Sequence, residues 1–324
     1  MIVKILDAYV NNPGDLSWEP FGELGDLTLY ERTSAEELAM RTTDVEIAIT
    51  NKIMWDKHAL DAAPHLKMIA LTSTGFNTVD LEEANRRGII VSNVPAYSTP
   101  DVTQMTIGLM LELCMHIGLH SDGVMAGDWV NSVDFTYWKT PLVEVSGKTL
   151  GIIGMGSIGQ SVARVAGALG MNVVFTNRSS KPEAETATCH QIELDELLAT
   201  ADFISLHCPA TPETNSIINP DAIARMKQGA FLINTARGTL IDEAAVAQAL
   251  KEGKLSGFAA DVVSVEPMQP SNPLLGAPNT IITPHIAWAT LEARTRLLNT
   301  VFANVEAYQC GTPQNIVNNP VSWR

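Results

Sequence analysis

The chain has 324 residues, 46% of them hydrophobic, and a formal net charge of -15 at pH 7. This length is more than one average domain needs and suits two, and the hydrophobic fraction argues against bulk disorder. An acidic surface repels phosphate groups, so the composition also argues against nucleic acid and anionic membranes as partners.

The first residues, MIVKILDAYV, resemble a strand and lack a basic segment followed by a long apolar run, so we do not interpret them as a signal peptide. None of the four cysteines forms a C-x-x-C pair. Such cysteines are typical of free thiols in a reducing compartment and predict no metal cluster. We therefore expect a cytoplasmic protein.

Short apolar runs alternate with helical patterns in the first third of the chain. The runs that we predict to be strands are residues 2–8, 46–50, 68–72 and 89–94. The helical patterns lie between them, at residues 34–41, 57–63 and 80–88. Continuous runs of Val, Ile, Leu and Ala separated by helices indicate parallel strands that are buried on both faces.

The middle of the chain repeats this alternation. The predicted strands are residues 149–154, 172–176, 203–208, 230–236, 257–262 and 280–285. The predicted helices begin near Ser157, Leu194, Pro220, Glu243 and Leu291. The sequence therefore predicts an α/β fold with two doubly wound parallel sheets.

The boundary between the two units is predicted at VPAYSTPDVTQ, where two prolines and a polar cluster end the first unit. A long helix then begins near Asp101, and residues 105–119 are predicted to be one buried helix, because Glu112 and His116 argue against a membrane span. The tail after the last helix is too short for a domain of its own. We expect residues 289–324 to complete a domain of residues 1–100, around a second domain of residues 101–288.

The segment GIIGMGSIG has the G-x-G-x-x-G spacing of a dinucleotide-binding loop, formed by Gly154, Gly156 and Gly159. It follows an apolar strand and opens a helix, as such a loop requires. The N–H groups at the helix start, including those of Ser157 and Ile158, would bind the pyrophosphate. The alternative is a glycine turn with a structural role only.

The next strand ends without the acidic residue that usually binds the adenosine ribose. Asn177, Arg178 and Ser179 stand there instead. An Asn does not repel a 2′-phosphate and an Arg can bind it, so the sequence favours NADP(H), with NAD(H) as the alternative. In that alternative, the segment is a solvated loop and Asn177 still bonds a ribose hydroxyl.

Three polar residues stand at the ends of apolar strands in the second unit, namely Arg237, Glu266 and His285. Ligands of open parallel sheets bind at the carboxyl ends of the strands, so these side chains are candidates for one site. An imidazolium stabilised by a carboxylate can protonate a developing alkoxide, and an Arg can hold a carboxylate by two bonds. Reduction of a 2-keto acid fits this set, although each residue alone also suits a surface ion pair or a turn.

The segments GIIGMGSIGQ, NTARGTLIDEAAVAQAL, GFAADVVSVEP and NTIITPHIAWAT, in this order, resemble the D-isomer-specific 2-hydroxyacid dehydrogenases. STGFNTVDLEEANRRGIIVSNVPAYSTPDVTQ is similar to the segment that joins that family's two domains, and the branch most resembled is glycerate dehydrogenase or hydroxypyruvate reductase. The resemblance implies a flavodoxin-like substrate domain and a Rossmann dinucleotide domain with a cleft between them. It also implies a homodimer.

The resemblance also implies roles for single residues. Arg237, Glu266 and His285 would be the catalytic set, and Asp261 would contact the nicotinamide carboxamide. The loop of Ser73, Thr74 and Gly75 would bind the substrate carboxylate through backbone amides, and Thr103 would lie beside the nicotinamide. Trp138 would reach the partner subunit's substrate site or only pack in the dimer, and Trp288 is a further candidate near the site. Asn51 and Lys52 are predicted either to face the cleft or to cap a helix.

The leading prediction is an enzyme that reduces hydroxypyruvate, and also glyoxylate, with NADPH or NADH, and that catalyses the reverse reaction. One alternative is a reductase for another 2-keto acid. A second alternative is a nucleotide-sensing binding protein, like the transcriptional corepressors that resemble these dehydrogenases. The acidic charge and the lack of long disordered arms argue against that second alternative.

Overall fold

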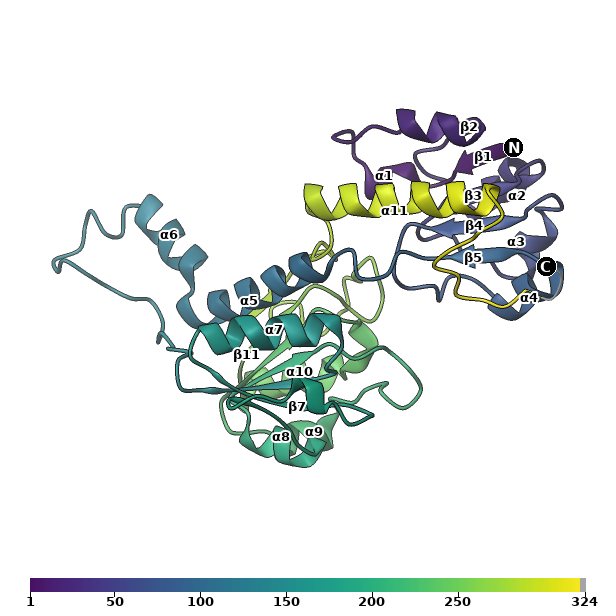
Figure 1. Ribbon diagram of the computed structural model, residues 1–324. Helices are drawn as coiled ribbons and strands as arrows, with labels where there is room; N and C mark the ends of the chain where they lie inside the picture. The colour runs from purple at the N-terminus through teal and green to yellow at the C-terminus, as the bar shows by residue number, and fades with distance from the viewer. Residues whose placement is uncertain (321–324) are drawn as a thin grey trace. The chain divides into compact units, whose positions relative to one another are not determined.

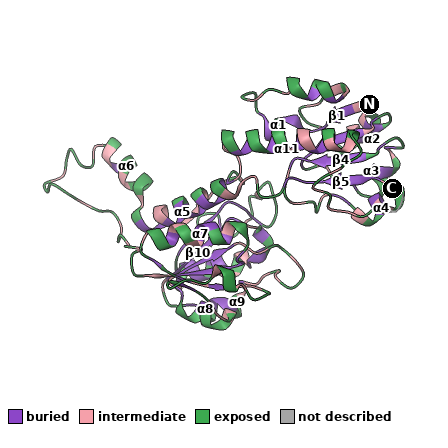
Figure 2. Cartoon of the chain, in the orientation of Figure 1, coloured by how far each residue is buried: buried purple, intermediate pink, exposed green. Residues whose placement is uncertain are grey.

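The computed structural model describes residues 1–320, which form two separate sheets of parallel strands (Figure 1). One compact unit contains Met1–Ser98 together with the chain from Ala289 onward, and the other contains Thr99–Trp288. The strands of both sheets are largely buried (Figure 2). The predicted α/β fold with two doubly wound sheets is confirmed.

The sheet of the first unit has the strand order β2-β1-β3-β4-β5. Its strands are β1 (Ile2–Ile5), β2 (Asp26–Leu29), β3 (Ile47–Thr50), β4 (Met68–Leu71) and β5 (Ile90–Ser92). This is the flavodoxin-like order 2-1-3-4-5, in which ligands bind at the carboxyl ends of the strands. Every residue of β3 and β4 is buried, as the apolar sequences IAIT and MIAL require.

Short polar motifs begin and end the helices of the first unit. These helices are α1 (Ala8–Asn11), η1 (Glu19–Leu24), α2 (Ala35–Thr42), α3 (Lys57–Asp61), α4 (Leu81–Arg87) and α11 (Leu291–Gln309). Ser34 and Glu37 form a capping box at the start of α2, and Asp56 and Asp80 cap α3 and α4. Gly88, with a φ of 73°, ends α4 in the left-handed conformation.

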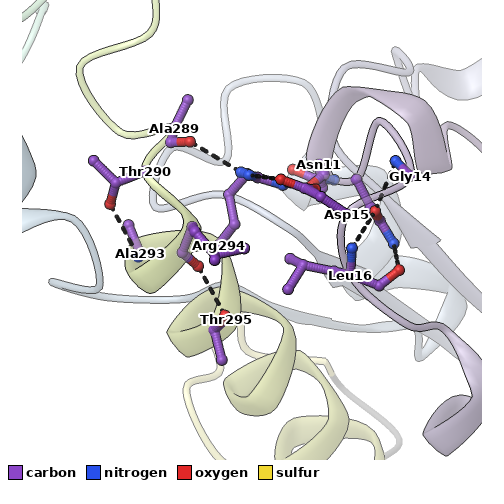
Figure 3. A network of polar contacts seen from close by, with 11 residues as sticks. Asn11, Gly14, Asp15, Leu16, Ala289, Thr290, Ala293, Arg294 and Thr295 are labelled. Atoms are coloured by element: carbon purple, nitrogen blue, oxygen red, sulfur yellow. Dashed lines mark hydrogen bonds and ion pairs between the residues drawn. The ribbon is translucent and has the colours of Figure 1, made fainter.

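Helix α11 is fixed to the start of the first unit by Arg294 (Figure 3). The guanidinium of Arg294 donates two bonds of 2.6 Å to the carboxylate of Asp15 and a third, of 2.9 Å, to the carbonyl oxygen of Ala289. Thr290 caps α11 through the N–H of Ala293. The pKa of Asp15 is held below its usual value, first by this hydrogen bond with Arg294.

The sheet of the second unit has the order β12-β11-β10-β9-β6-β7-β8. Its strands are β6 (Thr149–Ile153), β7 (Asn172–Thr176), β8 (Cys189–Gln191), β9 (Phe203–Leu206), β10 (Ala230–Asn234), β11 (Leu255–Ala260) and β12 (Thr280–Ile282). Counted within the unit, this is the Rossmann order 3-2-1-4-5-6 with one additional strand at the edge. The order reverses between β6 and β9, where a dinucleotide binds in this fold.

The helices of the second unit are α5 (Thr99–Met115), α6 (Ile117–Met125), α7 (Ser157–Ala168), η2 (Pro182–Ala184), α8 (Leu194–Thr200), α9 (Pro220–Arg225), η3 (Gly238–Leu240) and α10 (Glu243–Lys251). The five predicted helix starts agree with α7 to α11. The two strands that we did not predict, β2 and β8, are short and lie at the edges of their sheets. β2 contains no buried residue and β8 contains one, Cys189.

The predicted buried helix over residues 105–119 is confirmed only as far as Met115, where α5 ends. The chain turns at His116, which has a φ of 47°, and α6 begins in a new direction. The carboxylate of Glu112 accepts the N–H groups of Ile117 and Gly118 and so caps the second helix. Ile117 is 61% exposed, and Figure 1 shows α6 and the loop after it projecting away from the sheet of their unit.

No single helix among residues 1–320 is long and apolar enough to span a membrane. Together α5 and α6 have the length and composition of a span, but they are bent by 59°.

Candidate active site

The glycine loop has the geometry of a dinucleotide site. Gly154 follows β6 with a φ of +101°, and a Cβ there would lie 2.5 Å from the backbone nitrogen of Cys208. A Cβ at Gly159 would lie 2.2 Å from the carbonyl oxygen of Gly154, so only glycine lets α7 pack this closely. A Cβ at Gly156 would meet open space, which leaves room for a phosphate before the exposed N-terminus of α7 at Ser157.

Asn177 holds the glycine loop from the end of β7. Its side-chain oxygen accepts the N–H of Met155 at 3.1 Å, and its amide nitrogen donates to the carbonyl oxygen of Ser179 at 3.1 Å. Asn177 therefore stands where the ribose-binding acid usually stands. It supports the glycine loop and brings no negative charge.

The segment after Asn177 presents positive and polar groups. Arg178 and Ser179 are exposed, and the N–H of Lys181 donates to the side chain of Gln191 at 2.8 Å. The pKa of Glu213 is lowered, first by a hydrogen bond with Thr211 and least by the positive charge of Arg178. Arg178 thus has a weakly interacting, exposed carboxylate nearby.

His285 and Glu266 are in direct contact. Nδ1 of His285 lies 2.7 Å from Oε2 of Glu266, and the two side chains are 27% and 34% exposed. His285 follows β12, and Glu266 lies in the loop after β11, which is the neighbouring strand. Because Nδ1 is bound by the carboxylate, Nε2 is the ring nitrogen left for a substrate.

The backbone at His285 is fixed by groups on both sides. Its φ of 57° is in the left-handed region, which is uncommon for residues other than glycine. The indole N–H of Trp288 donates to the carbonyl oxygen of His285 at 2.8 Å. The carboxylate of Asp261 accepts the N–H groups of Ile286 and Ala287 at 2.9 and 2.7 Å. These bonds hold the imidazole in one direction.

Asp261 is almost fully buried at the end of β11 and also accepts the hydroxyl of Thr283 at 2.5 Å. An ionised carboxylate can accept about four hydrogen bonds, so three protein donors leave it able to accept one more. A contact of Asp261 with a carboxamide N–H remains compatible with this arrangement.

Arg237 ends the loop after β10 and is exposed. Its guanidinium donates one bond, of 2.7 Å, to the carbonyl oxygen of Ala236, and the fork has further N–H groups for a ligand. A Cβ at Gly238 would lie 1.9 Å from the carbonyl carbon of Val263, so the chain after Arg237 packs directly against the loop that leads to Glu266. The structure therefore brings the three candidate catalytic residues to the same edge of one sheet.

The loop of Ser73, Thr74 and Gly75 follows β4 at the carboxyl edge of the first sheet. Within residues 1–320, the backbone N–H groups of Thr74 and Gly75 donate to no protein acceptor. Thr74 is exposed and Gly75 is half-buried. Two adjacent free amides of this kind can bind an anion.

Asn51 has a role that differs from a helix cap. Its side chain is buried and donates to both the carbonyl and the hydroxyl oxygen of Thr72, at 2.6 and 3.0 Å, and to Asn11. The cap of α3 is Asp56. The interpretation of Asn51 and Lys52 as a cap is therefore wrong, and Asn51 supports the strand end that precedes the loop of residues 73–75.

The two remaining candidates, Thr103 and Trp138, belong to the second unit. The hydroxyl of Thr103 donates to the carbonyl oxygen of Thr99 in its own helix, and its side chain lines a groove between α5 and α7. Trp138 is 67% exposed and lies in the loop after α6, outside its own unit's core. Among the described residues, no group of three or more His, Cys, Asp or Glu side chains could hold a metal ion.

A sheet of Rossmann order, its glycine loop and an adjacent His–Glu pair with an Arg define a nicotinamide-dependent oxidoreductase. The model of the NAD binding domain of the D-isomer specific 2-hydroxyacid dehydrogenases matches residues 107–287. The chain belongs to this family.

Relatives and a solved structure agree with this assignment over nearly the whole chain. A hydroxypyruvate reductase of Blautia hydrogenotrophica is 43% identical, over 98% of this chain and 100% of that protein. A glycerate dehydrogenase of Methylorubrum extorquens is 41% identical, over 89% of this chain and 90% of that one. The acyclic imino acid reductase Bsp5, solved with NADPH and D-Arg, has a TM-score of 0.86 and 30% identity over 98% of this chain and 100% of that one.

Proposed function

We propose that the protein reduces hydroxypyruvate, and also glyoxylate, to the D-2-hydroxy acid, and catalyses the reverse reaction. The observation that carries this proposal is the 2.7 Å contact between His285 and Glu266, next to the loop of Arg237. The similarity to a hydroxypyruvate reductase and a glycerate dehydrogenase supports the choice of substrate.

In this mechanism, Glu266 stabilises the imidazolium form of His285 and fixes its Nδ1, so Nε2 carries the proton toward the substrate. Arg237 binds the substrate and polarises its keto group. A reduced nicotinamide held by the second unit would supply the hydride to the carbonyl carbon. The proton from Nε2 adds to the carbonyl oxygen, which yields the hydroxy acid. In the first unit, the free amides of Thr74 and Gly75 would bind a substrate carboxylate.

We propose that Gly154, Gly156, Ser157, Ile158 and Gly159 hold the pyrophosphate. The open space at Gly156 and the exposed start of α7 support this assignment.

The remaining cofactor contacts are also proposals. Arg178 and Ser179 would bind a 2′-phosphate, so NADPH is preferred and NADH is used less well. Asp261 would accept the nicotinamide carboxamide, and Thr103 would lie near the nicotinamide. The absence of an acid at Asn177 supports the preference for NADPH.

We also propose that the protein is a homodimer formed through α6 and the loop after it. This segment exposes large apolar side chains that a monomer in water would bury, namely Met125, Trp129, Val130, Val133, Phe135 and Trp138. Trp138 would then contact the partner's substrate site. Sedimentation equilibrium should give twice the chain mass at micromolar concentration, and a monomer at that concentration would contradict the proposal.

The experiment that tests the activity follows the absorbance of NADPH and of NADH with a panel of 2-keto acids. Hydroxypyruvate should have the highest kcat/KM in the panel, with glyoxylate next. A higher kcat/KM for another keto acid would show that hydroxypyruvate is not the preferred substrate. The proposed reduction of a 2-keto acid would still hold. Binding of nucleotide without any turnover would contradict the enzyme and favour a nucleotide-sensing protein.

A further inference from the structure

Three hydrogen bonds attach the loop of Ser73, Thr74 and Gly75 to the segment after β5. The N–H of Val94 donates to the carbonyl oxygen of Ser73 at 2.9 Å. The side-chain amide of Asn93 donates to the carbonyl oxygen of Thr74 at 2.7 Å. The hydroxyl of Thr74 donates to the carbonyl oxygen of Val94, also at 2.7 Å.

These bonds determine the direction of the two free amides. In a trans peptide, the C=O of one residue and the N–H of the next lie in one plane and point in opposite directions. The carbonyl of Ser73 is bound by Val94, which aims the N–H of Thr74 away from residues 93–94. The carbonyl of Thr74 is bound by Asn93, which does the same for the N–H of Gly75. Both N–H groups therefore leave the loop on the side opposite to its anchor.

Asn93 is itself held by two other asparagines. Asn304, which is fully buried on α11, donates its side-chain amide to the carbonyl oxygen of Asn93 at 2.9 Å. Asn315 donates to the side-chain oxygen of Asn304 at 2.7 Å, and its carbonyl oxygen accepts the N–H of Asn93 at 3.1 Å. An amide is neutral at every pH at which the protein is folded, so this chain of bonds holds its geometry without depending on a charge.

We propose that Asn93 is a positioning residue for the substrate carboxylate, and that Asn304 and Asn315 hold Asn93 in place. The inference rests on the proposed function, in which the N–H groups of Thr74 and Gly75 bind that carboxylate. Asn93 touches no reacting atom in this role. It acts by fixing one peptide plane.

The test compares Asn93→Ala with the parent enzyme on the best keto acid of the panel. Loss of one neutral hydrogen bond should raise KM by about 3- to 10-fold. The carboxylate is bound in both the ground state and the transition state, so kcat should change by less than about twofold. The dissociation constant of NADPH, measured by its fluorescence, should not change, whereas oxamate, a carboxylate that is not reduced, should bind more weakly by the same factor as KM.

Asn318 offers a matched control. Its side chain donates to the carbonyl oxygen of Ile89 at 2.8 Å and accepts the N–H of Val91 at 2.9 Å, so it supports the same strand without reaching Thr74. Asn318→Ala should lower the melting temperature but leave KM unchanged. An equal rise of KM in both variants would overturn the inference, because a general loss of stability would then explain it.

If Asn93→Ala does not fold, Asn93→Leu keeps about the size of the side chain, loses the donor and adds no charge, and Asn318→Leu is its control. A KM and an oxamate affinity that stay within about twofold of the parent in the Asn93 variant would overturn the inference. Failure of the proposed function is a separate result, because the parent enzyme would then reduce no keto acid at all.

Discussion

The carboxyl edges of the two sheets differ in the kind of polar group that they present. The first sheet ends in buried groups that bond one another. Most are neutral amides and hydroxyls, such as those of Asn11, Asn51 and Thr72. The buried carboxylate among them, that of Asp7, accepts the N–H groups of Asn51 and Lys52. The second ends in Glu266 and His285, which are ionisable and about one-third exposed. Neutral buried groups fix geometry at any pH, whereas groups in contact with water can exchange a proton. We therefore expect proton transfer at the edge of the second sheet, where His285 and Glu266 lie, and not at the edge of the first.

The largest effect that would test this division is expected at His285. His285→Ala removes the proton donor, so kcat should fall by about 10²- to 10⁴-fold while NADPH still binds. Turnover measured under saturating substrate, together with NADPH fluorescence, checks both parts. If the variant keeps nearly normal turnover, His285 is not the proton donor.

The next effect is expected at Arg237. Arg237→Lys keeps the charge but loses the planar fork, so kcat/KM for the keto acid should fall by about 10- to 100-fold. Steady-state kinetics measure this change, and the affinity for NADPH serves as the internal control. If the lysine enzyme matches its parent, two-point binding of the substrate by Arg237 is wrong.

A smaller effect is expected at Arg178, beyond the end of β7 on the same sheet. Arg178→Ala should weaken NADPH binding by about 10-fold, near the lower end for a charged hydrogen bond because the site is exposed. NADH binding should change little, which makes it the control. Titration of both nucleotides at two salt concentrations checks the result, since the loss should shrink at high salt. Equal affinities of the parent for NADPH and NADH would leave Arg178 as a solvated residue.

The smallest effects come from a matched pair of carboxylate-to-amide changes, one at each edge. Glu266→Gln removes the charge that stabilises the imidazolium of His285, so the loss of reductive activity on raising the pH should occur at a lower pH than in the parent. Asp7→Asn changes a buried carboxylate of the first edge and should leave that pH profile of kcat unchanged. If both variants shift the pH profile of kcat in the same way, the proposed difference between the two sheet edges is wrong.

The Asp7 variant should instead change the pH dependence of stability. Burial raises the pKa of Asp7 above its usual value, although bonds from the N–H groups of Lys52 and Asn51 oppose this. The stability that protonated Asp7 contributes is therefore complete when the pH is below the pKa of Asp7 in the unfolded chain. It is lost as the pH rises through the higher pKa of Asp7 in the folded protein. Relative to the parent, Asp7→Asn should gain unfolding free energy with rising pH, by at most about 1.4 kcal/mol per pH unit. Urea unfolding at pH 4 to 8 measures this slope, and a flat difference would contradict it.

The sequence predicted those parts of the structure that depend on local pattern. Ten runs rich in apolar residues predicted all strands except β2 and β8, which are short and lie at the edges of their sheets. The turn at His116 could not be predicted, because the positive φ falls on a histidine and Glu112 caps α6 from the preceding helix.

The site, too, could be predicted where it depends on local sequence pattern and not where it depends on distant contacts. Arg237, Glu266 and His285 stood out because each is a polar residue at the end of an apolar run. The amides of residues 73–75 were proposed from the family resemblance alone. The support of that loop by Asn93 could not be predicted, since Asn93 and Asn304 are 211 residues apart and an amide has no preferred spacing.

The bond between Asp15 and Arg294, which spans 279 residues, has a consequence for synthesis on the ribosome. The second unit is a continuous insertion of 190 residues, from 99 to 288, and all of it is made before α11. At typical rates, translation of this insertion takes roughly 10 to 40 s, during which the first unit lacks its closing helix. We expect released chains that end at Trp288 to bind NADPH but not oxamate, which binding assays on this truncated protein can check. Such chains contain the whole second unit but lack Asn304 and Asn315, so we expect newly made chains to bind the cofactor before they bind the substrate.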